Sequence, residues 1–167
     1  MSAQSPERSR QENSRHEKPR YESSRHEDAR IAAIVLLFEQ LSPEKLPQLE
    51  LIYTPTARFK DPFNEVQGVP AIRAIFEHMF RTLDAPRFVV HDTVVQGQQC
   101  FLTWDFIFSL KGREMPPLVV RGGSHLKLAD DHRICDHRDY WDVAEELYEK
   151  LPLLGALMRW LKRRVNS

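Results

Sequence analysis

The sequence predicts an α+β domain in which helices pack on one face of an antiparallel sheet. Apolar residues at helical spacing fill the first half of the chain, and long runs with strand composition fill the second half. Only short polar segments separate those runs, which favours consecutive antiparallel hairpins. Helices followed by an antiparallel meander are typical of α+β proteins whose helices pack on one face of the sheet.

The first half of the chain contains three predicted helices. Apolar spacing predicts the first over 30–41. Ser42 and Pro43 supply an N-cap and an N1 proline for a short second helix that ends before Thr54. A brief extended stretch over 57–60 follows. The third helix opens at Gly68 and carries one broad apolar stripe made of Ile72, Ile75, Phe76, Met79, Phe80 and Leu83.

After Pro86 the spacing changes to that of strands. Four runs rich in Val, Ile, Phe and Trp are bounded by turn residues. The predicted strands are 87–96, 99–111, 116–129 and 132–141. Gly122 and Gly123 stand in the middle of the third of these strands, where glycine marks a bulge or the close approach of another group.

The two ends of the chain differ from the middle. Residues 1–29 hold almost no large apolar side chain, and the tetrapeptide Ser-Arg-His-Glu at 14–17 returns at 24–27. Such a segment cannot bury enough surface to offset its ordering entropy, so we expect a disordered polar tail over 1–29 and a folded domain over 30–167. A last helix is expected from Asp142, interrupted by a proline and basic towards its end. Its apolar face is expected to close the domain or to join two subunits in a homodimer, and contact with a membrane is the less favoured alternative.

The composition excludes several classes of protein. The 167 residues suit one domain, and 24 basic side chains balance 24 acidic ones, which gives no electrostatic basis for binding nucleic acid. The chain has neither an apolar run of about 18 residues, as a membrane span needs, nor a secretory signal. Its two cysteines make no disulfide framework. We therefore expect a cytoplasmic protein without a nucleic-acid partner.

Two stretches resemble the nuclear-transport-factor-2-like superfamily. The segment 53–63 (Tyr-Thr-Pro-Thr-Ala-Arg-Phe-Lys-Asp-Pro-Phe), with Gly68 and Ile72, is similar to a motif of that superfamily, and 126–141 is similar to its last hairpin. The resemblance covers about 30–142. It implies a cone-shaped, strongly curved and mostly antiparallel sheet that wraps around the N-terminal helices and encloses one apolar pocket. Ketosteroid isomerases, SnoaL-like polyketide cyclases, scytalone dehydratases and limonene-epoxide hydrolases have this fold.

Asp61 stands where the resemblance places the catalytic base of the ketosteroid isomerases. A carboxylate that moves protons on a carbon acid needs an apolar wall that excludes water, and Phe59, Phe63 and Phe76 are candidates for it. The alternative is that Asp61 and Pro62 only form a turn, with the carboxylate capping local backbone groups. Both interpretations remain open.

The oxyanion donors of the ketosteroid isomerases have no counterpart. That enzyme uses a Tyr and a protonated Asp. The matching positions here hold Leu37 or Phe38 and Ser124. Because one serine hydroxyl cannot replace the pair, we do not expect steroid isomerisation.

A set of polar side chains follows the last strand. His137, Asp139 and Trp141 share one parity and therefore project from one face. If Trp141 lines the pocket, as the resemblance implies, His137 and Asp139 line it too. Together with Asp61 they would supply the groups that accept and donate protons in acid–base catalysis. SnoaL-like cyclases similarly use a late-strand Asp with a nearby His. The alternatives are a solvated strand face, or a salt bridge from Asp139 to one of three arginines, Arg58, Arg121 or Arg138.

The remaining pocket candidates are mostly aromatic, and Trp104, Phe106 and Phe108 share one strand face. The full set of pocket-lining candidates is Tyr53, Phe59, Phe63, Phe76, Trp104, Phe106, Phe108, Ser124 and Trp141. The seven histidines show no recognised ligand spacing, so we expect no metal and no cofactor.

Three functional hypotheses follow. The first is an isomerase, cyclase, dehydratase or hydrolase acting on a small hydrophobic molecule, with Asp61 and Asp139 as base and acid and His137 as an orienting or relay group. The second is a non-catalytic pocket protein that binds a ligand or assembles with a partner. The third, less favoured, is an adaptor that acts through the basic C-terminal helix.

Overall fold

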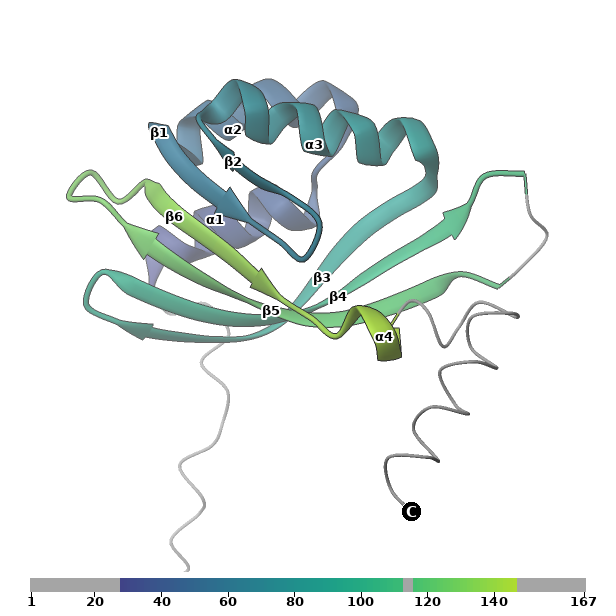
Figure 1. Ribbon diagram of the computed structural model, residues 1–167. Helices are drawn as coiled ribbons and strands as arrows, with labels where there is room; N and C mark the ends of the chain where they lie inside the picture. Colours follow the sequence, from purple (N-terminus) through teal and green to yellow (C-terminus); the bar gives the residue numbers. More distant parts are fainter. Residues whose placement is uncertain (1–27, 113–115, 147–167) are drawn as a thin grey trace, which may run out of the picture.

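The computed structural model describes residues 28–112 and 116–146. In this part a six-stranded, strongly curved sheet wraps around one layer of helices, and the helices α1 to α3 all lie on its concave side (Figure 1). The predicted α+β fold is therefore confirmed. Most of the predicted polar tail and the C-terminal helix beyond Glu146 lie outside the described residues.

The helical layer follows the predicted order. Helix α1 (Ala29–Glu39) is capped at its N-terminus by Asp28, whose carboxylate accepts the Arg30 backbone N–H at 3.0 Å. The predicted second helix is a 3-10 segment η1 (Pro43–Gln48) followed by one α-helical turn, α2 (Leu49–Ile52). Pro47 stands inside this stretch and has no N–H to donate, which favours the division. Helix α3 (Val69–Thr82) matches the third prediction.

The strands form one sheet in the order β2-β1-β6-β5-β4-β3. All neighbours are antiparallel except β1 and β6, which are parallel. The consecutive hairpins from β3 to β6 are therefore confirmed. The parallel pair brings the first strand of the chain, β1, next to the last strand, β6. The strands are β1 (Tyr53–Lys60), β2 (Glu65–Gln67), β3 (Leu83–Gln96), β4 (Gln99–Leu110), β5 (Leu118–Leu128) and β6 (Ile134–Tyr140), followed by the short helix α4 (Val143–Glu146).

Two strands differ from the prediction. Strand β1 begins at Tyr53 and so is longer than the expected stretch over 57–60. Strand β3 begins at Leu83 and runs through Pro86. The register with β4 shifts around this proline, and β3 lies at the edge of the sheet, where a residue without an N–H is tolerated.

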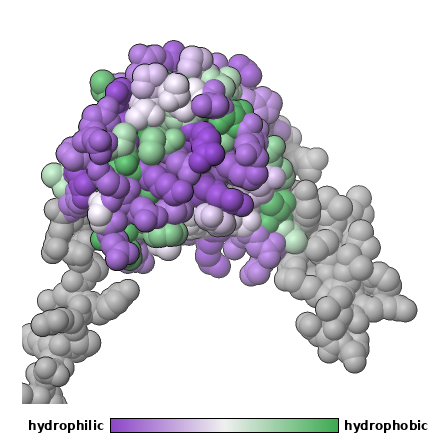
Figure 2. Space-filling view, turned by 60° about the vertical axis from the view of Figure 1, so that its left-hand side comes forward, coloured by the Kyte–Doolittle hydropathy of each residue, from purple (hydrophilic) through white to green (hydrophobic). Residues whose placement is uncertain are grey.

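The core lies between the helices and the concave face of the sheet. Its largest fully buried side chains come from both layers: Ile31, Val35, Leu49, Tyr53, Ile72, Cys100, Leu126 and Ile134. The space-filling view shows a mainly hydrophilic surface broken by small, separate apolar patches (Figure 2). Within the described residues, no helix has the length and apolar character that crossing a membrane requires.

Candidate functional site

A cavity of about 390 Å³ opens between helix α3 and the concave face of the sheet. Its volume lies in the range of small-molecule sites, roughly 300–1,000 Å³. Most of its lining is aromatic or aliphatic, and its polar side chains are few. The aromatic side chains are Phe59, Phe63, Phe76, Phe88, Trp104, Phe106, Phe108 and Trp141, and the polar ones are Asp61, Asn64, His78, Thr82 and Asp139.

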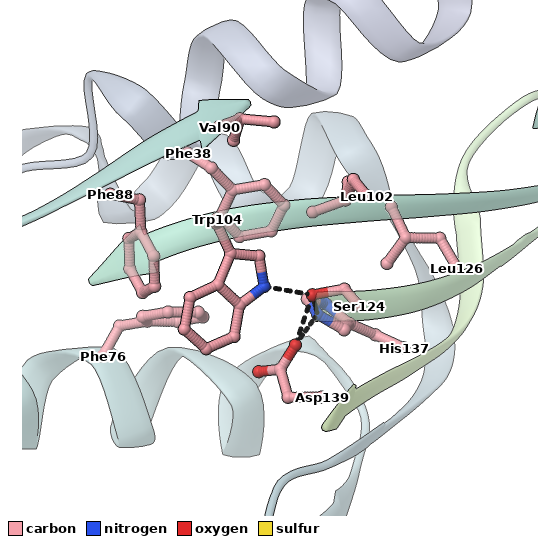
Figure 3. A pocket seen from close by; sticks show the side chains of 10 residues that line it. All are labelled: Phe38, Phe76, Phe88, Val90, Leu102, Trp104, Ser124, Leu126, His137 and Asp139. Atoms are coloured by element: carbon pink, nitrogen blue, oxygen red, sulfur yellow. Dashed lines mark hydrogen bonds and ion pairs between the residues drawn. The ribbon is translucent and has the colours of Figure 1, made fainter. Parts of the chain in front are cut away.

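A second, much smaller cavity of about 30 Å³ lies deeper, towards α1 (Figure 3). Phe76, Phe88, Trp104 and Asp139 border both cavities. His137 and Ser124 line only the smaller one. Asp139 therefore stands at the boundary between the buried end of the site and the larger cavity.

The position of Trp104 depends on a glycine in the neighbouring strand. In the β4–β5 register Trp104 lies opposite Gly122. A Cβ atom added at Gly122 would stand under 3.0 Å from three carbons of the indole ring. The register shows no shift at this point, so of the two roles predicted for the glycine pair, Gly122 fulfils the close approach and not the bulge.

Asp139 accepts two hydrogen bonds on one carboxylate oxygen. The Ser124 hydroxyl donates to Oδ1 at 2.5 Å, and Nε2 of His137 lies 2.8 Å from the same atom. The indole N–H of Trp104 donates to Oγ of Ser124 at 2.9 Å, so the hydrogen of that hydroxyl is directed at Asp139. Figure 3 shows the other carboxylate oxygen turned away from these partners. It accepts no hydrogen bond from the described residues.

This polar cluster is buried. His137 is 4% exposed, the side chain of Asp139 is 16% exposed, and Tyr53 is fully buried. The Tyr53 hydroxyl lies 2.5 Å from Nδ1 of His137. Burial raises the pKa of Tyr53 well above its ordinary value, and the negative charge of Asp139 raises it further.

Both alternatives to an acid–base role on this strand can be compared with the geometry. The face that carries His137 and Asp139 is mostly buried, since His137 is 4% exposed and the side chain of Asp139 is 16% exposed. In the described part of the chain no arginine pairs with Asp139. Arg58 instead lies 3.5 Å from Asp136, and Arg138 lies over the ring of Tyr140.

Asp61 caps the turn that follows β1. Its Oδ1 accepts the backbone N–H groups of Phe63 at 2.7 Å and Asn64 at 2.6 Å, and its Oδ2 accepts the side-chain amide of Asn64 at 2.9 Å. Asp61 also borders the larger cavity and, together with Asp139 and Trp141, an open groove outside it. The hydrogen bonds of Asp61 thus agree with the turn-forming interpretation, and its place beside the cavity agrees with the predicted location at the pocket.

The structure brings most of the sequence-predicted residues to the larger cavity, with three exceptions, the first of which is His137, which lines only the smaller cavity. Tyr53 lies behind His137 and lines neither cavity, and Ser124 borders only the smaller one. Phe63, at 58% exposed, stands at the rim against Trp141.

Sequence reasoning missed Phe88 and several side chains of α3. Phe88 lies opposite Phe106 in the β3–β4 register, and the two rings stack with centroids 4.7 Å apart. Pairing the predicted strands along their hairpin would have found it, because Phe106 was already assigned to the cavity face. Among the described residues, no group of three or more His, Cys, Asp or Glu side chains is placed to hold a metal ion.

Residues 35–137 match the model of the SnoaL-like domain family. No curated protein matches the sequence. Solved structures share the fold at low sequence identity, as three of them illustrate.

The first is a Catenulispora acidiphila protein with a ketosteroid isomerase-like fold, in complex with trimethylamine (TM-score 0.61, 14% identity, 72% of this chain and 90% of that chain). The second is a proposed SnoaL-like polyketide cyclase from Jannaschia (TM-score 0.61, 17% identity, 70% and 87%). The third is an epoxide hydrolase from M. tuberculosis similar to limonene-epoxide hydrolase (TM-score 0.57, 14% identity, 83% and 94%).

Proposed function

Because the chain belongs to the SnoaL-like domain family, we propose that it is an enzyme that moves protons on a small apolar substrate, with Asp139 as the acid–base group. One observation carries this proposal. Two donors hold Oδ1 of Asp139 from the buried side, while Oδ2 has no partner among the described residues and the carboxylate borders an apolar cavity.

The environment of Asp139 suits proton transfer. A carboxylate that two donors fix at the edge of a mostly apolar cavity is oriented before the substrate binds, and few polar groups compete for its free oxygen. In the proposed step Oδ2 takes a proton from a C–H bond beside an electron-withdrawing group. The electron pair of that bond moves into the substrate, and the new carboxylic acid then returns its proton to another atom. Isomerisation, cyclisation and dehydration share this step.

Asp61 has a supporting role in this proposal. Both of its oxygens accept hydrogen bonds within the turn, which shapes the rim of the cavity next to Phe63. We therefore assign proton transfer to Asp139 and assign Asp61 to the shape and negative potential of the rim.

The test uses β-tetralone, an apolar ketone with acidic C–H bonds, as a probe of proton abstraction. Nuclear magnetic resonance in heavy water measures the rate at which deuterium replaces these hydrogens. We expect the full chain to accelerate exchange over buffer, and Asp139→Asn to lose this acceleration by about a hundredfold or more. Asp136→Asn is the matched control, because Asp136 is on the same strand but pairs with Arg58 and Lys127. An Asp139→Asn variant that exchanges as fast as the unaltered chain would overturn the assignment.

A non-catalytic ligand-binding protein is the second candidate. This candidate is favoured because the residues at the positions of the oxyanion donors cannot act as donors to a substrate. Leu37 and Phe38 are apolar, and the hydroxyl hydrogen of Ser124 is already directed at Asp139. Binding of β-tetralone that quenches tryptophan fluorescence, with no acceleration of exchange, would support this candidate. The homodimer and the cytoplasmic location remain predictions, and sedimentation velocity of the full chain tests the first of them.

A further inference from the structure

In the described part of the chain the hydroxyl of Tyr53 makes a single hydrogen bond, from a fully buried position at the start of β1. Its ring stacks on the imidazole of His137, with centroids 6.0 Å apart and planes 15° apart, and it meets the edge of Phe38. Its hydroxyl lies 2.5 Å from Nδ1 of His137. Among the described residues this nitrogen is the one hydrogen-bond partner of the hydroxyl.

The direction of this hydrogen bond follows from the chemistry of the phenol. Burial and the nearby charge of Asp139 both disfavour the phenolate, so Tyr53 keeps its hydrogen. A buried O–H without an acceptor costs about 1–3 kcal/mol, and Nδ1 is the acceptor at hand. Tyr53 therefore donates, and Nδ1 carries no hydrogen.

That direction also sets the state of the other ring nitrogen. A neutral imidazole has one protonated and one bare nitrogen, so a bare Nδ1 places the hydrogen on Nε2. Nε2 then donates to Oδ1 of Asp139 over 2.8 Å. Together with the Ser124 hydroxyl, it forms a second donor chain that converges on the same carboxylate oxygen.

We propose that Tyr53 is a positioning residue that holds His137 neutral, with its hydrogen on Nε2, so that Asp139 keeps its negative charge without a cationic partner and can take a proton through Oδ2. This inference rests on the proposed function of Asp139. If His137 took up a second proton, Nδ1–H would face the Tyr53 oxygen and leave the phenol hydrogen without an acceptor. Asp139 would then pair with a cation and become a weaker base.

Few titratable groups face His137. Asp139 comes from its own strand and Tyr53 from β1, and both contact a ring nitrogen. Within 28–112 and 116–146, the other side chains with a ring contact or hydrogen bond to His137 do not titrate: Phe38 of α1, Phe59 of β1 and Ser124 of β5. Because the Tyr53 hydroxyl donates to the bare Nδ1 of the neutral ring, its removal is expected to favour the positively charged form of His137.

The experiment records long-range proton–nitrogen correlations of the histidine rings in the full, nitrogen-15-labelled chain. The signal that disappears in His137→Gln identifies the residue. In the unaltered chain at neutral pH we expect a bare Nδ1 and a protonated Nε2, and we expect that pattern to persist near pH 6. In Tyr53→Phe we expect a doubly protonated ring near pH 6. Tyr140→Phe is the control, because it removes the hydroxyl of a half-exposed tyrosine on β6 and should leave the signal unchanged.

A rate measurement separates positioning from packing. Exchange of β-tetralone by Tyr53→Phe should fall about fivefold near pH 6, the equivalent of one hydrogen bond, and recover near pH 8, where the ring returns to neutral. A packing defect would lower the rate equally at both values.

Three results would overturn the inference: a hydrogen on Nδ1 in the unaltered chain, a neutral His137 in Tyr53→Phe near pH 6, or a rate deficit independent of pH. The first needs no variant, so the test stands even if Tyr53→Phe fails to fold. Loss of exchange in Asp139→Asn together with a neutral His137 in Tyr53→Phe would refute the role of Tyr53 alone. Full exchange in Asp139→Asn would refute the proposed function instead.

Discussion

Replacing Gly122 by alanine should damage the candidate site through Trp104. The added methyl group would stand where the six-membered ring of the indole now lies, under 3.0 Å from three of its carbons. Trp104 is held there from the other side by Phe88, whose ring meets it edge-on at 5.8 Å, and by its hydrogen bond to Ser124. The indole must therefore move, and its N–H must leave Ser124.

The expected cost has two parts. Overpacking a well-filled core costs typically about 1–3 kcal/mol, and the lost hydrogen bond adds about 1 kcal/mol. We therefore expect Gly122→Ala to lower the free energy of unfolding by about 2–4 kcal/mol, a large share of the roughly 5–15 kcal/mol that stabilises a typical domain.

Urea unfolding followed by circular dichroism measures this loss. Gly97→Ala is the control: unlike Gly122, Gly97 has a positive φ, +61°, but no atom lies near its added methyl group. Its cost should therefore be about 1–2 kcal/mol of backbone strain and should leave the site intact. A double-mutant cycle with Trp104→Phe isolates the contact, because the smaller ring leaves room for the methyl group. We expect the two substitutions to be less than additive by at least about 1 kcal/mol. A Gly122→Ala penalty that is the same in both backgrounds, or below about 0.5 kcal/mol, would refute the reasoning.

Three further predictions concern other parts of the molecule. Asp61→Ala should lower the free energy of unfolding by about 1 kcal/mol, because two backbone N–H groups lose their acceptor, whereas Asp61→Asn keeps an oxygen there; an equal loss in both variants, measured in urea, would contradict the capping role. The hydrogen bond from the Arg30 side chain lowers the pKa of Asp28 from 3.8 to about 2, so the stabilisation by the Asp28 carboxylate is complete above about pH 4 and is lost as the pH falls towards 2. In Asp28→Asn the melting temperature should therefore depend less on pH between about 4 and 2, with no change in its pH dependence above that window. Burial raises the pKa of Cys100 to about 11, so iodoacetamide near pH 8 should modify Cys135 first, and mass spectrometry showing equal modification of both thiols in the folded chain would argue against that burial.

Local periodicity predicted much of the fold and of the cavity wall. Side chains alternate along a strand, so parity placed Trp104, Phe106 and Phe108 on one face and His137 with Asp139 on one face of another strand. That this second face points towards the pocket was implied by the family resemblance and not by parity. The short strand β2 was missed because three residues with a mostly exposed pattern carry no periodic signal.

The connections within the polar cluster could not be predicted in the same way. The hydrogen bond between Tyr53 and His137 joins residues 84 positions apart, through a parallel strand pair that no turn sequence announces. The Ser124 contact with Asp139 depends on the β5–β6 register, in which these two residues lie opposite each other. Such contacts follow from tertiary pairing and not from the residues around either partner.

The place of β6 in the sheet has a consequence for how the chain folds. This strand lies between β5 and β1, so the last strand of the sheet to be synthesised separates two strands that come before it. Until β6 is inserted, β1 and β5 each present an unpaired edge, and such edges are prone to intermolecular pairing. Closing so long a loop is slow compared with forming the β3–β5 hairpins. A nascent chain that ends before residue 134 thus carries two open edges and lacks both His137 and Asp139, so the truncations that favour aggregation also remove the polar cluster of the cavity.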